Sequence, residues 1–175
     1  MNNTLVRWNR LPASEAESEV LACCGSRTWA RALTSRRPFT GEAMLLAAAD
    51  EIWRNLTVAD WMEAFASHPR IGESPTMEAQ GKKSPGARSA EWSADEQSRA
   101  GLAPEATKAA LREANREYEN RFGRTFIVCA NGKSATEILE ILRRRLENDP
   151  GTELQEASAQ QLEITRIRLR RWLVG

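Results

Sequence analysis

Five short patterns place a hydroxyl residue three positions before an acid or amide side chain, and this repetition constrains the fold more than any other feature. The pairs are Ser14 with Glu17, Thr57 with Asp60, Ser93 with Glu96, Ser134 with Glu137, and Thr152 with Gln155. In such a pair the hydroxyl accepts a hydrogen bond from an amide of the first helical turn, while the second side chain reaches back to the cap residue. Five helix starts of this kind predict an all-α fold.

Helix ends and apolar spacing support the same prediction. Gly25, Gly101 and Gly123 follow periodic segments, where a left-handed residue is expected to end a helix. Two rows recur at helical spacing and are expected in the core: Leu111, Ala114, Tyr118 and Phe122, and Met44 or Leu45, Ala48, Ile52 and Leu56. With 175 residues, the chain is long enough for one compact helical bundle, a single domain over residues 1–175.

Two stretches do not fit a helix. The run from Phe126 to Ala130 is short, apolar and rich in β-branched residues, and it lies between Gly123 and Asn131. We expect an irregular buried segment near residues 126–130, whose backbone amides need partners. The stretch 73–91 is rich in Ser, Pro, Gly and Lys, which predicts a mobile loop. Whether that loop closes over a pocket stays open.

The composition excludes several functional classes. A formal net charge of +1 gives no general attraction to nucleic acid or to an anionic membrane, and we interpret Arg143–Arg145 as a solvated helix face. The three cysteines do not form a disulfide or zinc pattern, and a single histidine leaves few ligands for a metal enzyme. We therefore expect reduced thiols and no metal site. Because no apolar run reaches membrane-spanning length, we also expect a cytoplasmic protein.

The single histidine lies in the stretch Ser67–Gly72, where an apolar helix is expected to end. An unperturbed imidazole has a pKa of about 6.5, so it can hold or release a proton near neutrality. Pro69 stiffens the neighbouring backbone and biases His68 away from the helical region, so the ring should project from a rigid helix end. This arrangement suits a catalytic acid, and it also suits a helix stop followed by a surface histidine.

Two further places are suited to binding an anion. The stretch Trp92–Gln97 is predicted to open a helix, whose first amides are either capped by Ser93 and Glu96 or available to an anionic ligand. Arg168 lies four residues before Trp172 on a largely apolar face of the last helix. Its guanidinium must be paired or face a cavity, unless its stem packs on Trp172 and its head reaches solvent.

A series of short segments is spread in order over nearly the whole chain. They are Asn9–Pro12, Arg37–Phe39, His68–Gly72, Trp92–Ser93, Glu96–Gln97, Glu119–Gly123, Phe126–Ala130, Gly132–Ser134 and Ile164–Leu169. Together they resemble the 2-oxo-4-hydroxy-4-carboxy-5-ureidoimidazoline (OHCU) decarboxylases of urate degradation. The polar insert before Trp92 is similar to that of bacterial members.

The resemblance implies a compact all-α homodimer that converts OHCU to (S)-allantoin as a carboxy-lyase, without metal or organic cofactor. By position, His68 matches the proton donor and Glu96 the catalytic carboxylate. Arg168 matches the arginine that holds the anionic substrate, and the segment 126–130 matches the piece whose backbone contacts it. The implied substrate-binding residues are Pro69, Ser93, Ala94, Asp95, Glu96, Gln97, Phe126, Ile127, Val128, Cys129, Ala130 and Arg168.

The chemistry of this reaction needs those residue types. Loss of carbon dioxide leaves an electron pair that drains into the adjacent ring C=N, and a proton must then arrive on one face. Whether Glu96 bonds the substrate hydroxyl or orients the imidazole stays open. One alternative is a non-catalytic helical module that binds a small ureide or a partner protein. Another is nucleic-acid binding through the arginine runs, which the net charge disfavours.

Overall fold

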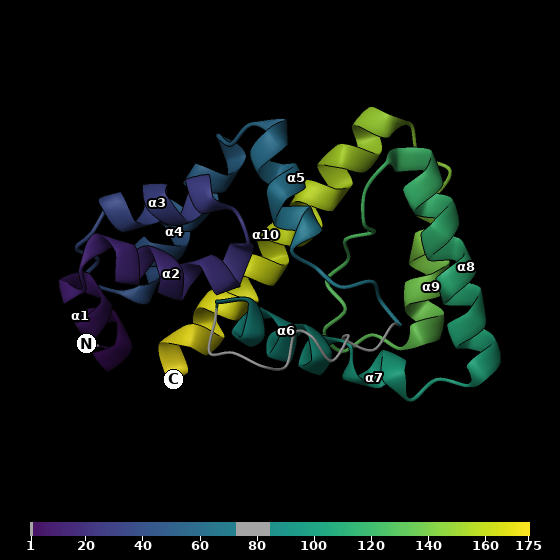
Figure 1. Cartoon of the computed structure of the whole chain (residues 1–175), viewed down its shortest axis with the longest axis horizontal. Helices are drawn as coiled ribbons and strands as arrows, with labels where there is room; N and C mark the ends of the chain where they lie inside the picture. The colour runs from purple at the N-terminus through teal and green to yellow at the C-terminus, as the bar shows by residue number, and fades with distance from the viewer. Residues whose placement is uncertain (1, 73–84) are drawn as a thin grey trace. The chain divides into compact units, whose positions relative to one another are not determined.

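The computed structural model describes residues 2–72 and 85–175, apart from the side chains of residues 85–87 and 101, and within these ranges it contains helices and no strand (Figure 1). The predicted all-α class is therefore confirmed. The helices are α1 (Asn3–Arg10), α2 (Ala13–Cys24), α3 (Arg27–Ser35), α4 (Glu42–Arg54), α5 (Val58–Ala66), α6 (Pro85–Glu96), α7 (Ser98–Gly101), α8 (Glu105–Phe122), α9 (Ala135–Arg145) and α10 (Pro150–Val174).

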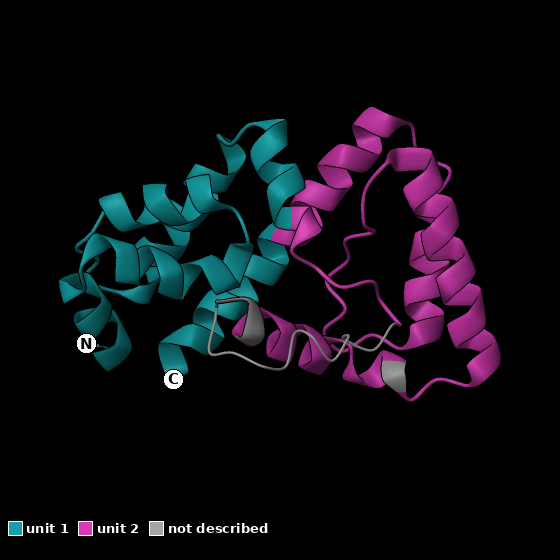
Figure 2. Ribbon diagram, in the orientation of Figure 1, with its two compact units in different colours: residues 1–64, 162–175 teal, residues 65–161 magenta. Residues whose placement is uncertain are grey.

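The chain divides into two compact units (Figure 2). Unit 1 consists of Met1–Ala64 and Leu162–Gly175, and unit 2 consists of Phe65–Gln161. Two helices, α5 and α10, contribute residues to both units. A single domain over residues 1–175 stays a prediction. Within the described ranges, no helix is long and apolar enough to cross a membrane.

Two of the five predicted helix starts are confirmed. Before α5, the Thr57 hydroxyl accepts from the Asp60 amide, and the Asp60 carboxylate accepts from Thr57. Before α9, Ser134 and Glu137 form the complete reciprocal capping box. In both cases each side chain bonds an amide that the helix would otherwise leave unbonded, as the pattern predicts.

The other three starts are wrong, because an earlier residue begins the helix. α2 begins at Ala13, directly after Pro12, and α10 begins at Pro150, directly after Asp149. The Asp149 carboxylate caps α10 by accepting from the amides of Gly151 and Thr152, both at 3.0 Å. A proline with its fixed φ, or an aspartate that caps, therefore starts these helices before the predicted hydroxyl is reached. The third case, Ser93, lies in the candidate site.

Unit 1 is built around buried tryptophans, several of which donate the indole N–H to a backbone carbonyl. Trp8 bonds the carbonyl of Ala16 at 2.9 Å, and Trp29 bonds that of Ala49 at 3.1 Å. These bonds join α1 to α2 and α3 to α4. A large ring can be buried at low cost only when its polar atom finds such a partner.

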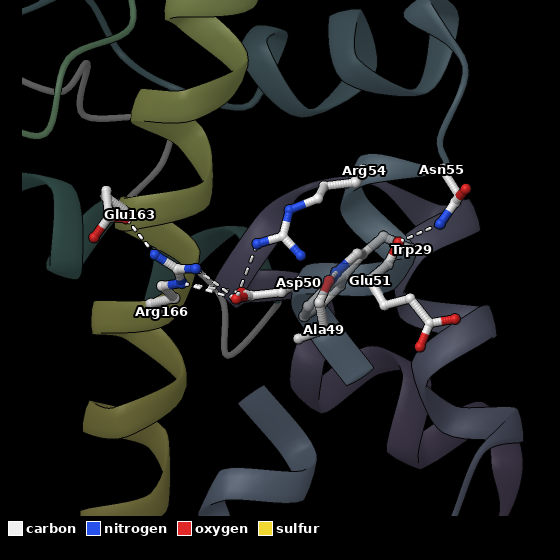
Figure 3. A network of polar contacts seen from close by, with 8 residues as sticks. All are labelled: Trp29, Ala49, Asp50, Glu51, Arg54, Asn55, Glu163 and Arg166. Atoms are coloured by element: carbon white, nitrogen blue, oxygen red, sulfur yellow. Dashed lines mark hydrogen bonds and ion pairs between the residues drawn. The ribbon is translucent and has the colours of Figure 1, made fainter. Parts of the chain in front are cut away.

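A polar network fixes the last part of α10 against α4 in unit 1. Arg166 donates from its Nε to both carboxylate oxygens of Asp50, at 3.0 and 3.2 Å (Figure 3). Glu163 pairs with the same guanidinium, and Arg54 reaches Asp50 from one helical turn away. Several charges that share partners hold two helices in register better than an isolated surface pair does.

Unit 2 packs α8 and α9 side by side around an apolar cluster (Figure 1). The row Leu111, Ala114, Tyr118 and Phe122 on α8 is buried in it, as its helical spacing predicts. One prediction here is wrong, because Arg145 is only 1% exposed rather than part of a solvated face. Its guanidinium is buried since it pairs with Glu153, which has no exposed surface.

The Glu153 carboxylate is the centre of a buried network in unit 2. It accepts from Nε of Arg145 at 3.0 Å, from the Tyr118 hydroxyl at 2.5 Å and from Nδ2 of Asn148 at 2.8 Å. Burial and the bond to Glu153 raise the pKa of Tyr118 above its ordinary value, so its hydroxyl keeps the proton that it donates. The network joins α8, α9 and α10.

We predict that Glu153→Ala lowers the free energy of unfolding by about 3–5 kcal/mol, because it leaves the Arg145 charge buried without its partner. Tyr118→Phe removes one hydrogen bond to a charged acceptor and should cost less, about 1.5–3 kcal/mol. Urea unfolding followed by circular dichroism measures both. Glu113→Gln, in an exposed pair with Arg116 on α8, is the control and should change stability little. A Glu153 variant as stable as this control would contradict the prediction.

Candidate functional site

His68 lies two residues beyond the end of α5, as the sequence predicts. The helix ends at Ala66, and the His68 amide donates to the carbonyl of Phe65 at 3.2 Å. Both His68 and Pro69 are half-buried. The imidazole is therefore carried by a short turn at a helix end rather than by the helix itself.

The residues that follow His68 are attached to α8. Arg70 donates from Nε and Nη2 to the two carboxylate oxygens of Glu119, at 2.7 and 2.6 Å. The carbonyl of Ile71 accepts from Nδ2 of Asn115 at 3.0 Å, and this bond is buried. The Asn115 side chain thus bonds a carbonyl that has no regular backbone partner in this turn, and the Arg70–Glu119 pair is a second attachment to α8.

The next attachment joins two stretches that are far apart in the sequence. The Gly72 amide donates to Oε1 of Gln97 at 3.3 Å. Gly72 has a φ of +84°, a left-handed conformation that other residues rarely adopt. The backbone therefore turns sharply at Gly72 and brings the histidine segment to the end of α6. The sequence predicted Gln97 as a substrate-binding residue and missed this contact.

The predicted helix start at Ser93 is wrong. α6 begins at Pro85, so Ser93, Ala94, Asp95 and Glu96 lie in its last turns, and the Gln97 amide donates to the Ser93 carbonyl at 3.0 Å. Proline suits the first turn of a helix, and the residues between it and Ser93 include good helix formers. A last turn presents carbonyls and partial negative charge, so the expected attraction of an anion to first-turn amides does not apply here.

The same correction changes the predicted loop 73–91. Its residues 85–91 belong to α6, and residues 73–84 lie outside the described part of the chain.

The side chains at the end of α6 divide between two environments. Ser93 is 2% exposed and Glu96 is 9% exposed, whereas Ala94 and Asp95 are exposed. Residues three apart share a helix face, so Ser93 and Glu96 lie on the buried side of α6 together. The hydroxyl of Ser93 and the carboxylate of Glu96 are thus held largely away from bulk water in unit 2.

The segment 126–130 forms neither helix nor strand and is buried except for Cys129, which confirms the predicted irregular apolar piece. Three side chains bond its backbone. Arg145 donates from Nη1 to the Ile127 carbonyl at 2.6 Å, and the Cys129 amide donates to Oε1 of Gln160 at 2.9 Å. Nζ of Lys133 donates to the Cys129 carbonyl at 2.8 Å. The expected need for backbone partners is met by side chains of neighbouring elements.

Arg168 belongs to unit 1 and is completely buried. Its Nη1 donates to the carbonyl of Ala22 at 3.5 Å, so the alternative in which its head reaches solvent is wrong. Cys24 is also fully buried there. Burial raises the pKa of the Cys24 thiol to about 12, and the positive charge of Arg168 opposes this effect only in part. The structure therefore keeps an arginine charge inside unit 1 at the position that the sequence singled out.

A pocket of about 580 Å³ lies beside the histidine in unit 2. It is lined by His68, Arg70, Glu119, Gly123, Arg124 and Thr125. From the sequence we predicted no site role for the two arginines or for Glu119, although Arg70 and Glu119 both fall in the segments that carry the resemblance. Their pairing was not predictable because they are 49 residues apart. Among the described residues, no group of three or more His, Cys, Asp or Glu side chains could hold a metal ion.

These features define a class, an all-α protein in which a histidine at a helix end lines a pocket with charged walls. Such a residue set is suited to acid–base chemistry on a small polar ligand. A family model described as OHCU decarboxylase matches residues 9–170. The chain belongs to the OHCU decarboxylase family.

Individual relatives agree with this assignment. The uric acid degradation bifunctional protein TTL of Arabidopsis thaliana is 36% identical over 156 residues, which are 87% of this chain and 46% of that protein. The 2-oxo-4-hydroxy-4-carboxy-5-ureidoimidazoline decarboxylase of Amia calva is 34% identical over 142 residues, 80% of this chain and 77% of that protein. The chain thus spans about half the length of the Arabidopsis relative and most of the Amia one.

A solved structure has the same fold. The crystal structure of OHCU decarboxylase in the presence of (S)-allantoin superposes with a TM-score of 0.74 and 31% sequence identity, over 90% of this chain and 98% of that one. At this level of identity the likeness extends beyond the arrangement of helices to the sequence itself.

We predict that a thiol-alkylating reagent modifies Cys129 alone in the folded protein at pH 8. Cys23 and Cys24 have no exposed surface, and the raised pKa of Cys24 leaves almost none of the reactive thiolate, whereas Cys129 is half-buried. Mass spectrometry should find one modified site in native buffer and three in denaturant, and Cys129→Ser should abolish the native reaction. Modification of Cys24 in the native protein would contradict its burial.

Proposed function

We propose that this protein decarboxylates OHCU to (S)-allantoin in urate degradation, with His68 as the proton donor. The observation that carries the proposal is the family match over residues 9–170, which includes the histidine and its flanking segment. The position of His68 at a helix end, beside a pocket with charged walls, supports its part in the reaction.

The reaction divides into two steps with different needs. The bond between the ring carbon and the carboxylate breaks, carbon dioxide leaves, and the electron pair moves into the adjacent C=N bond. This shift leaves a C=C bond between the carbon that lost the carboxylate and the neighbouring ureido-bearing carbon, and the ring nitrogen takes up a proton. A proton then adds to the ureido-bearing carbon from one face and sets the stereocentre, while the hydroxyl on the other carbon loses its proton and becomes the ring carbonyl. The first step needs a substrate held in one orientation, and the second needs an acid with a pKa near neutrality. His68 is the only imidazole in the chain.

In this proposal Arg168 binds the anionic substrate. A guanidinium offers a planar pair of donors that matches a carboxylate, and one buried among apolar neighbours is worth more to a ligand than one in water. The backbone of residues 126–130 bonds polar groups of the substrate, and Pro69, next to His68, contacts the substrate. Ser93, Ala94 and Asp95 at the end of α6, with Gln97 directly after it, complete the binding residues.

Glu96 has a catalytic part in this proposal. Either it bonds the substrate hydroxyl or it orients the imidazole of His68. Its low exposure supports both, since a carboxylate held away from bulk water forms stronger directed hydrogen bonds.

We also infer a cytoplasmic homodimer. The three cysteines do not form a disulfide, which fits a reducing compartment. The dimer follows from the resemblance to the family, and the near-zero net charge is in keeping with a small molecule rather than nucleic acid as the partner.

The test is optical. OHCU prepared fresh from urate is mixed with the protein, and circular dichroism follows the appearance of (S)-allantoin. We expect a faster rise than in buffer, unaffected by a chelator. A folded sample that binds OHCU without accelerating its conversion would instead identify a ureide-binding module.

We predict that His68→Asn lowers kcat by on the order of 10² to 10⁴, the usual contribution of a general acid, while the fold survives. The same dichroism assay measures the rate, and far-ultraviolet dichroism checks the helices. Unchanged turnover in a folded variant would remove His68 from the mechanism.

We predict that Arg168→Lys raises KM by on the order of tenfold or more, because Lys keeps the charge but loses the planar pair of donors. Steady-state kinetics measure this change. Arg170→Lys is the matched control, since Arg170 lies on the same helix in an exposed pair with Glu42. Equal constants for the two variants would count against the binding role of Arg168.

A further inference from the structure

We propose that Glu119 is a positioning residue for His68 and acts through Arg70. This inference rests on the proposed function, because it assigns to the ion pair the task of holding the proton donor at one face of the substrate. Glu119 itself does not touch the reacting atoms in this proposal.

The connection between the ion pair and the imidazole is short. Only Pro69 separates His68 from Arg70 in the chain, and its ring fixes its own φ. Both carboxylate oxygens of Glu119 bond the Arg70 guanidinium, at 2.7 and 2.6 Å. Two parallel bonds to a planar group set its orientation as well as its distance. The ion pair therefore fixes the guanidinium of a residue that lies only two positions after the histidine.

The part of α8 that carries Glu119 is anchored in the core of unit 2. Glu119 lies in the last turn of α8, between Tyr118, which has no exposed surface, and Phe122, which is 9% exposed. The opposite side of this turn is thus held in the core of unit 2. The helix ends at Phe122 and is capped by Gly123, whose amide donates to the Glu119 carbonyl at 2.8 Å. The backbone that carries the Glu119 carboxylate is therefore held in place.

Side chains of α8 bind two consecutive residues of the histidine segment. Asn115 lies one turn before Glu119 and donates to the Ile71 carbonyl at 3.0 Å. Residues four apart share a helix face, so Arg70 and Ile71 are bound to the same stripe of α8. Asn115 is 2% exposed and holds the backbone, whereas the ion pair holds the end nearer to His68.

The Arg70–Glu119 pair differs from the Arg145–Glu153 pair because it is partly exposed, whereas the latter is buried. Arg70 and Glu119 keep 44% and 24% of their side-chain surface exposed. Such a partly exposed pair contributes little to stability. It also forms part of the wall of the same pocket as His68. A contribution to stability alone therefore does not explain why this pair lies beside the imidazole.

The expected consequence concerns stereochemistry. If His68 is held loosely, water can protonate the intermediate from either face before the imidazole does. Glu119→Gln keeps the shape of the side chain and removes its charge, so it should loosen Arg70 without creating a cavity. Misplacement of a reacting group by about 1 Å costs on the order of 10² in rate.

The experiment compares Glu119→Gln with Glu105→Gln. Both residues lie on α8 and both pair with an arginine, but Glu105 pairs with Arg112 away from the histidine segment. We expect Glu119→Gln to lower kcat by tenfold to a hundredfold, to leave KM within about twofold, and to lower the enantiomeric excess of (S)-allantoin. The control should match the parent protein in all three. Exchange of both charges, Arg70→Glu with Glu119→Arg, should restore part of the excess.

A second measurement does not depend on turnover. Because His68 is the only histidine, its ring gives a single, unambiguous set of NMR signals. We expect these signals to broaden or shift in Glu119→Gln and to stay unchanged in Glu105→Gln. If the two variants have the same ring signals and the same enantiomeric excess, the positioning role is wrong. If the ring signals respond but the parent protein does not convert OHCU, the proposed function fails while Glu119 still positions His68.

Discussion

Unit 2 depends on the ion pair between Arg145 and Glu153, which is almost completely removed from solvent. Burying two charges costs free energy, and that cost is offset only when the groups are also well hydrogen-bonded. Here Glu153 accepts from Tyr118 and Asn148 as well as from Arg145, and Arg145 also donates to the Ile127 carbonyl. The bonds reach α8, α9, α10 and the irregular segment. A shift of any one of these elements would leave a buried charge short of partners, so the pair favours a single arrangement of unit 2.

The same principle extends to the candidate site. Its two key pieces, the segment after His68 and residues 126–130, have no regular secondary structure, so their backbone groups need other partners. Asn115 and Gln97 supply these for the first piece, and Arg145, Gln160 and Lys133 for the second. Side chains from helices thus hold irregular backbone in place. Such backbone can direct amides and carbonyls at a small polar molecule, which a helix cannot do along its length.

Local patterns predicted much of the fold. Where they were wrong, a residue outside the pattern decided the structure. The hydroxyl–acid pairs at Thr57 and Ser134 identified real helix starts, but the equivalent pair at Ser93 lies within the last turns of α6. A capping pattern shows only that a helix can begin at a residue. When an earlier proline has already begun the helix, the pattern lies inside it. Likewise, Arg145 looks like its exposed neighbours in the sequence, because its partner Glu153 comes from the next helix and only the folded chain brings the two together.

The sequence by itself determined the all-α class, the irregular buried run near residues 126–130, the helix end at His68 and the family, because these depend on residue type, spacing and order. Only the tertiary structure decided that Arg70 pairs with Glu119, that Gln97 bonds Gly72 and that Arg168 is fully buried. Each of these depends on contacts between residues far apart in the chain. No local preference encodes such a contact, since it exists only after the helices have packed.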